Sequence, residues 1–199
     1  MTGDLVRFSG DPREGRAPAR LEGVLSLPSG AGPFPALVML HGCTGLRTGT
    51  GAIQGKLRFW AGHLRELGYA TLMVDSFTPR GIDEVCTGRH MLSPVRDRAD
   101  DARGALRYLQ GRSDIRPDRI GLLGWSNGAA GAPITIKVYP DAHHSFDAPD
   151  TPGRYRPEVK NHNRLDGDCG ATVGTDPAAR ADSIAEVTRF LAAQITAPR

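Results

Sequence analysis

The sequence predicts an α/β fold, a three-layer sandwich around a mainly parallel central sheet. Three short apolar runs, at residues 36–40, 70–74 and 120–123, have the composition of strands that are buried on both faces. Segments with helical spacing of apolar residues lie between these runs. Strands that alternate with helices favour a parallel sheet with helices packed on its faces.

The first half of the chain supplies a strand and a helix around these runs. Residues 21–27 alternate between apolar and polar side chains, as a half-buried strand does. Trp60, Leu64 and Leu67 recur at helical spacing, and Gly68 is a suitable residue to end that helix.

The second half predicts two more helices and a strand. Residues 95–109 form an amphipathic pattern, and residues 134–139 are rich in the β-branched residues typical of strands. Asp176 is a favourable N-cap, and Pro177 suits the first position of the helix that follows. The expected buried stripe of that last helix consists of Ile184, Val187, Phe190 and Leu191.

Length and charge indicate a single ordinary globular domain over residues 1–199. The net charge is +3, from 25 Lys and Arg against 22 Asp and Glu, and the arginines are scattered along the chain. Nucleic-acid binders usually cluster their basic residues, so no nucleic-acid partner is expected. The first residues contain no apolar stretch like that of a signal peptide, and no window resembles a membrane span. The expectation is therefore a cytoplasmic protein without a membrane partner.

The three cysteines, Cys43, Cys86 and Cys169, are far apart and show no CxxC spacing. This odd number predicts free thiols rather than a disulfide framework, with a Cys86–Cys169 bridge as the alternative. The six histidines show no metal-ligand spacing, so neither a metal nor another cofactor is expected.

The clearest chemical motif is Gly-Trp-Ser-Asn-Gly at residues 124–128, which matches G-x-S-x-G. In a nucleophile elbow, the serine lies on a tight turn between a strand and a helix, and small residues flank it. The motif directly follows the apolar run at residues 120–123, which is the context that an elbow requires. Ser126 is therefore the candidate nucleophile.

Two further segments complete a hydrolytic site. The sequence His-Gly-Cys-Thr-Gly at residues 41–45 follows a buried strand and can direct a backbone N–H at a substrate carbonyl. The N–H groups of Cys43 and Asn127 are thus predicted to form an oxyanion hole, whereas His41 is expected to brace the loop. Past residue 139, two adjacent histidines offer a general base.

Together these segments resemble the dienelactone hydrolase family of α/β-hydrolases. The matching stretches are VMLHGCTGL, VDSFTPRG, GLLGWSNGA, VYPDAHHSFD and DPAARADSIAEVTRFLA, spread over roughly residues 20–195. Many members of this family carry a serine nucleophile in place of the cysteine of the name-giving enzymes. The resemblance implies that Ser126 is the nucleophile and that His144, which precedes Ser-Phe, is the base.

The resemblance also suggests substrate contacts. Arg80 lies near the position where an arginine of the name-giving members meets the substrate carboxylate, although a structural role is an equal alternative. Trp125, beside the nucleophile, is a second candidate contact.

The chain departs from the family in the interval after the nucleophile. Only seven residues, 127–133, separate Ser126 from the strand expected at residues 134–139. A parallel crossover normally takes a dozen or more residues, so one strand and its helices are expected to be missing. An antiparallel hairpin would place His144 roughly 20 Å from Ser126, whereas an extended crossover would keep the two residues close.

The same deletion leaves the acid of the triad unidentified. Asp141, Asp147 and Asp168 lie near His144 in the sequence, and Asp75 ends a strand. The leading hypothesis is a hydrolase of carboxylic esters or lactones that forms a serine acyl-enzyme. The alternative is a catalytically inactive member of the fold that acts as a binding module. The sequence predicts no oligomeric state.

Overall fold

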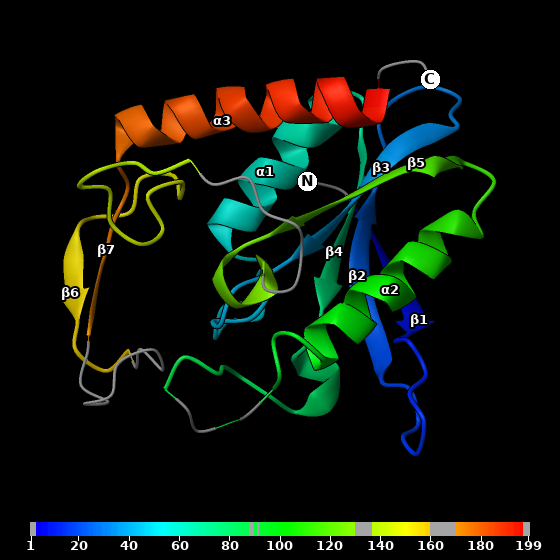
Figure 1. The fold of residues 1–199 in the computed structure, drawn as a ribbon, viewed down its shortest axis with the longest axis horizontal. Coiled ribbons are helices and arrows are strands. Elements are labelled where there is room, and N and C mark those ends of the chain that lie inside the picture. Colours follow the sequence, from blue (N-terminus) through cyan, green and yellow to red (C-terminus); the bar gives the residue numbers. More distant parts are fainter. Residues whose placement is uncertain (1–2, 88–89, 91, 130–136, 160–169, 197–199) are drawn as a thin grey trace.

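The computed structural model describes residues 3–87, 90, 92–129, 137–159 and 170–196. Its central feature is a five-stranded sheet in the order β1-β2-β4-β3-β5 (Figure 1). The strands are β1 (Asp4–Ser9), β2 (Arg20–Ser26), β3 (Phe34–Leu40), β4 (Ala70–Asp75) and β5 (Ile115–Gly124). β4, β3 and β5 run parallel to one another, whereas β1 and β2 are antiparallel to their neighbours. The predicted parallel core is confirmed.

Helices cover both faces of this sheet. On one face, α1 (Gly55–Glu66) and α3 (Pro177–Leu191) pack on a cluster that includes Leu37, Met39 and Met73. On the other face, α2 (Asp97–Gln110) packs on a second cluster built from alternate residues of the same strands. Figure 1 shows α1 and α3 on the side of the sheet opposite to α2. The three-layer prediction is therefore confirmed.

The helix boundaries follow the local signals in the sequence. α1 ends at Glu66, and Gly68 adopts a positive φ of 89°, which glycine tolerates without strain. At the start of α3, the Asp176 side chain accepts a hydrogen bond of 2.9 Å from the Ala179 N–H. Some residues of the expected apolar faces are exposed: Val95 precedes α2 and is 60% exposed, Phe190 of α3 is 59% exposed, and Leu122 of the run at residues 120–123 is 47% exposed.

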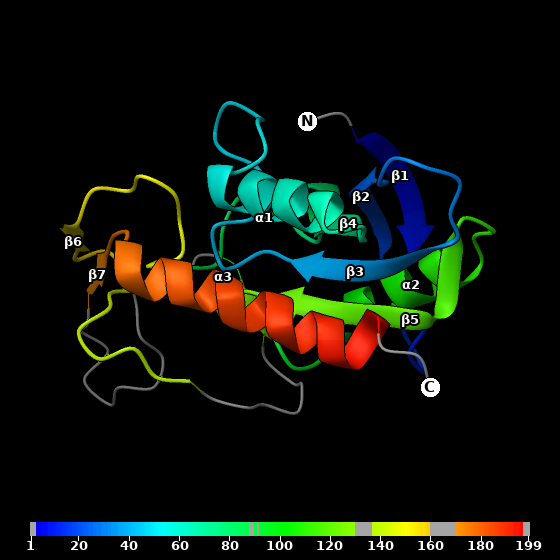
Figure 2. The ribbon, with the colours of Figure 1, turned by 90° about the horizontal axis from the view of Figure 1, so that it is seen from above.

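The C-terminal part departs from the strand expected at residues 134–139. Residues 134–136 lie outside the described residues, and residues 137–139 are not in a strand. The short strands β6 (Arg154–Arg156) and β7 (Ala171–Val173) instead form a separate antiparallel sheet. Figure 2 shows this pair beyond the N-terminal end of α3, away from β1 and β2. Among the described strands, β5 is thus the last of the main sheet, because the interval after it is too short for a helical crossover.

None of the described helices has the length and apolar character to cross a bilayer.

Candidate active site

The turn after β5 has the geometry of a nucleophile elbow. Ser126 begins the short 3-10 helix η2 (Ser126–Ala129) and has a φ of 50°, which is costly for a residue other than glycine. A Cβ on Gly124 would lie 2.3 Å from the Gly128 carbonyl oxygen, and one on Gly128 would lie 2.5 Å from that of Leu40. Both glycines of the motif are therefore required by close backbone packing.

The loop after β3 lies against this elbow. The Trp125 N–H donates to the Leu40 carbonyl at 3.1 Å, and an added Cβ on Gly42 would lie 3.5 Å from the Ser126 Cβ. Cys43, Ser126 and Asn127 line one cavity of about 880 Å³. The structure thus brings together the residues predicted to form the oxyanion hole, while their role stays a prediction.

His144 lines the same cavity as Ser126. The backbone of His144 is hydrogen-bonded to β7 and to Gly174, which follows β7. The His144 N–H donates to the Thr172 carbonyl at 3.2 Å, and the His144 carbonyl accepts from the Gly174 N–H at 3.1 Å. The imidazole Nδ1 lies 3.0 Å from the Ser145 hydroxyl. No hydrogen bond joins the Ser126 and His144 side chains, both of which the structure describes.

Three influences act on the pKa of His144. Burial lowers this pKa, the positive charge of Lys56 lowers it further, and the negative charge of Asp147 opposes both effects. The net direction is downward. The imidazole is therefore neutral at neutral pH, which is the form that can accept a proton.

Asp147 is the most enclosed of the described acid candidates near His144. The residue is 7% exposed, and its carboxylate accepts hydrogen bonds from the indole N–H groups of Trp125 at 2.6 Å and Trp60 at 3.3 Å. Lys56 lies 3.3 Å from its other oxygen. Asp147 therefore acts on His144 through its charge, since its carboxylate accepts hydrogen bonds from Trp60, Trp125 and Lys56 instead.

The remaining acid candidates lie elsewhere. Asp75 accepts hydrogen bonds from the N–H groups of Phe77 and Thr78 and pairs with Arg47 at 3.2 Å, so it stabilises the turn after β4. Asp141 is exposed, and Asp168 lies outside the described residues.

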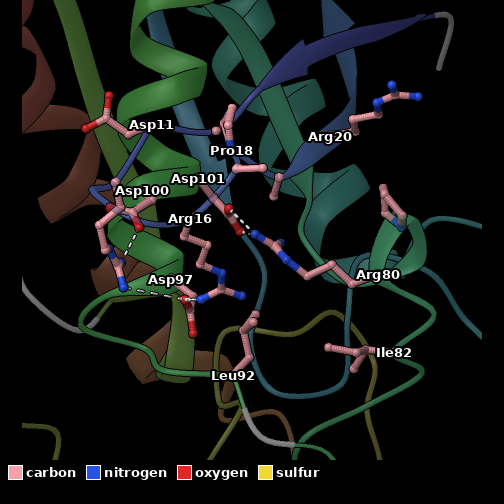
Figure 3. A pocket seen from close by; sticks show the side chains of 15 residues that line it. Asp11, Arg16, Pro18, Arg20, Arg80, Ile82, Leu92, Asp97, Asp100 and Asp101 are labelled. Atoms are coloured by element: carbon pink, nitrogen blue, oxygen red, sulfur yellow. Dashed lines mark hydrogen bonds and ion pairs between the residues drawn. The ribbon is translucent and has the colours of Figure 1, made fainter.

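The two predicted substrate contacts have different surroundings. Trp125 lines the cavity of Ser126. Arg80 instead forms two hydrogen bonds with the buried Asp101, at 2.6 and 2.9 Å, and a third with the Ser76 carbonyl at 2.6 Å. Figure 3 shows Arg80 and Asp101 facing each other in a separate cavity of about 540 Å³. The structure therefore gives Arg80 an ion pair and does not bring it to Ser126.

His41 is enclosed between the ends of β3 and β4. Its Nδ1–H donates to the Gly42 carbonyl at 2.7 Å, and its Nε2 accepts the Ser76 N–H at 3.3 Å. Burial, followed by the charge of Arg98, lowers the pKa of His41 to about 3. These contacts agree with the expected role in bracing the loop.

The expectation that the cysteines are free thiols is wrong for two of them. Cys43 and Cys86 form a disulfide with a Cα–Cα distance of 5.0 Å, while Cys169 lies outside the described residues. The parallel strands β3 and β4 end at the same edge of the sheet, so the loops that follow them meet there. The Val85 N–H also donates to the Cys43 carbonyl at 2.9 Å. Sequence spacing alone gave no signal of this pairing.

In the described part of the chain, no group of three His, Cys, Asp or Glu side chains could hold a metal ion.

Comparisons with known proteins match this architecture at the level of structure. No protein-family model and no curated protein sequence matches the chain. A solved structure called m3DLH aligns over 98% of both chains, with 18% identity and a TM-score of 0.63. A dienelactone hydrolase from Anabaena variabilis is 25% identical, with a TM-score of 0.46, and the alignment covers 64% of this chain.

An esterase with p-nitrophenol is 19% identical over 64% of this chain, with a TM-score of 0.44. The chain spans only 54% of the length of that dienelactone hydrolase and 36% of that esterase. The strand order and the alignment with m3DLH show a reduced α/β-hydrolase fold. At 18% identity, the likeness to m3DLH is one of fold alone.

Proposed function

We propose that this chain hydrolyses carboxylic esters or lactones through a serine acyl-enzyme. The observation that carries the proposal is the strained elbow of Ser126, which lines one cavity together with His144, Cys43 and Asn127. Strained backbone at a nucleophile exposes the attacking atom, and the neighbouring N–H groups are suited to an oxyanion.

The reaction would proceed in two halves. The Ser126 Oγ attacks the carbonyl carbon while His144 accepts the hydroxyl proton. The two N–H groups stabilise the negative oxygen, and the alcohol leaves with the proton from His144. Water then attacks the acyl-enzyme and gives its proton to His144, which returns a proton to Ser126 as the acid departs. In apo enzymes the bond between nucleophile and base is often long, so substrate is expected to bring the two residues together.

Loss of the nucleophile tests the proposal. Ser126→Ala should abolish both hydrolysis of p-nitrophenyl esters and labelling by a fluorophosphonate, because both reactions need the activated hydroxyl. Ser183→Ala is a matched control, since Ser183 lies on α3 and bonds the Arg180 carbonyl. Equal turnover by wild type and Ser126→Ala would refute the proposal.

The alternative is an inactive α/β-hydrolase fold that binds a small molecule. It is favoured by one observation: among the described residues, no carboxylate is hydrogen-bonded to His144. This alternative predicts that the wild-type protein is not labelled by the fluorophosphonate although it is folded.

A further inference from the structure

Arg98 is a charged residue in the interior of the protein. It lies in the first turn of α2, is 1% exposed and is among the largest fully buried side chains. Burial lowers the pKa of Arg98 to about 10, so its guanidinium is still charged at neutral pH. A buried charge is costly unless it is paired or hydrogen-bonded, so the partners of the Arg98 guanidinium determine whether this charge is tolerated.

The hydrogen bonds of Arg98 go to two neutral groups on different segments. Nη2 donates to the His41 carbonyl at 2.9 Å, and Nη1 donates to the Asn127 side-chain oxygen at 3.3 Å. The guanidinium also lies 5.4 Å from the ring centre of Phe77. Asp101, one turn further along α2, is paired with Arg80.

These two segments are the halves of the proposed oxyanion hole. His41 lies two residues before Cys43, and Asn127 itself carries the second N–H. The elbow and the β3 loop already touch, since a Cβ on Gly128 would lie 2.6 Å from the His41 carbonyl oxygen. Arg98 therefore bridges the two halves from the side of α2.

We propose that Arg98 is a positioning residue that fixes the separation of the Cys43 and Asn127 N–H groups; this rests on the proposed function. Oxyanion donors act only when they are preorganised about 2.7–3.1 Å from the developing charge. A small displacement of either segment therefore weakens transition-state binding and leaves ground-state binding largely unchanged.

The proposal is distinguished from a purely structural role by its pattern of contacts. The carboxylates of Asp101 and Asp75 favour the charged form of Arg98 through their charges, whereas both side-chain hydrogen bonds of its guanidinium go to neutral groups of the two oxyanion segments. In addition, the buried Arg98 Nε has no hydrogen-bond partner among the residues that the structure describes. The guanidinium is thus incompletely satisfied where it lies, and its two bonds both reach oxyanion segments.

Arg98→Lys tests this role, because lysine keeps the charge but lacks the planar fork that reaches two acceptors. We expect kcat for a p-nitrophenyl ester to fall about tenfold or more with KM nearly unchanged, since loss of one oxyanion donor costs about 10²–10³ in kcat. Inhibition by phenylboronic acid, which forms a tetrahedral adduct with the serine, should weaken by a similar factor.

Arg119→Lys is the matched control. Arg119 is also buried, at 7% exposure, but it donates to the Ile195 carbonyl beside the end of α3. This variant should lower stability without changing kcat or the boronate affinity. Asn127→Ala keeps the backbone N–H and removes one acceptor, so it should produce a smaller loss of kcat that is not additive with Arg98→Lys.

The outcomes distinguish the role proposed for Arg98 from the proposed ester hydrolysis. Wild-type turnover that depends on Ser126 but survives in Arg98→Lys, with unchanged boronate affinity, would overturn the role of Arg98 alone. A parallel loss of kcat in Arg98→Lys and Arg119→Lys would also overturn it, because the effect would then reflect stability. Absence of Ser126-dependent turnover in the wild type would overturn the proposed function, and this role with it.

Discussion

Lys56 is the cation that most directly affects the proposed base. It bonds Asp147 at 3.3 Å, and its charge lowers the pKa of the nearby His144. Lys56→Gln removes this repulsion and leaves the charge of Asp147 in place, so the pKa of His144 should rise. Because only neutral His144 can accept the serine proton, the acid limb of the kcat/KM–pH profile should move to higher pH.

Lys137→Gln is the control for this titration. Lys137 pairs with Asp182 and Glu186 on α3, so its removal should leave the acid limb in place. An acid limb that moves to lower pH, or not at all, in Lys56→Gln would contradict the electrostatic account of His144.

The local motifs predicted which residues meet at the cavity. Ser126 and Cys43 each follow a buried strand, and parallel strands bring their carboxyl ends to one edge of the sheet. Arg98 was missed because its contact with Asn127 joins residues 29 positions apart, and no spacing rule encodes it. The one indication in the sequence was the position of Arg98, a charged residue one turn before Ala102 on the apolar side of the helix predicted at residues 95–109.

The elbow is the element on which the proposed chemistry depends most strongly. Gly128→Ala would place a Cβ 2.5 Å from the Leu40 carbonyl oxygen, and backbone atoms cannot move aside as a flexible side chain does. We expect a loss of about 1–3 kcal/mol in the free energy of unfolding. Ester hydrolysis should fall by more than this destabilisation explains, because the clash displaces Ser126.

Gly23→Ala provides the comparison in urea unfolding and kinetics. Its added Cβ would lie 2.8 Å from Leu72 Cδ1 and 3.0 Å from the Met73 carbonyl oxygen, within β2 and away from the elbow. This variant should lose stability and keep its kcat. If both variants lost stability equally and neither lost activity, the elbow would not position the nucleophile.

Elements were predictable where burial gave them a simple pattern. β3 and β4 are buried on both faces, so continuous apolar runs revealed them. The apolar run at the end of β5 revealed that strand as well, although β5 lies at the edge of the described sheet and its Leu122 is 47% exposed. β1 was missed because this edge strand is largely exposed and carries only two partly buried residues, Val6 and Phe8, in its core contacts. The strand expected at residues 134–139 was predicted from its composition. Composition carries no information on whether the connection from β5 to this segment is long enough for a parallel crossover.

For the whole molecule, the Cys43–Cys86 disulfide is the main covalent constraint that the structure describes. It closes a loop with a sequence separation of 43. Removing it with Cys86→Ser should lower the free energy of unfolding by about 2–4 kcal/mol, because the unfolded chain regains conformational freedom. Urea unfolding of Cys86→Ser should then coincide with that of the reduced wild-type protein.

The bond itself can be checked by alkylating the denatured, unreduced protein and analysing the peptides by mass spectrometry. Cys43 and Cys86 should remain unmodified. Modification of both would contradict the disulfide. Disulfides persist mainly in oxidising surroundings, so this bond does not favour the cytoplasmic location expected from the sequence.

The two side chains proposed to exchange a proton belong to two different hydrogen-bonded sheets. Ser126 follows β5 of the large sheet, whereas the backbone of His144 is bonded to the short strand β7. A single continuous sheet would fix both residues within one cooperative unit. Within the described residues, the small sheet consists of two strands of three residues each, and such a pair has little stability of its own. We therefore expect gentle heating to abolish ester hydrolysis reversibly, while most of the circular dichroism signal of the protein persists.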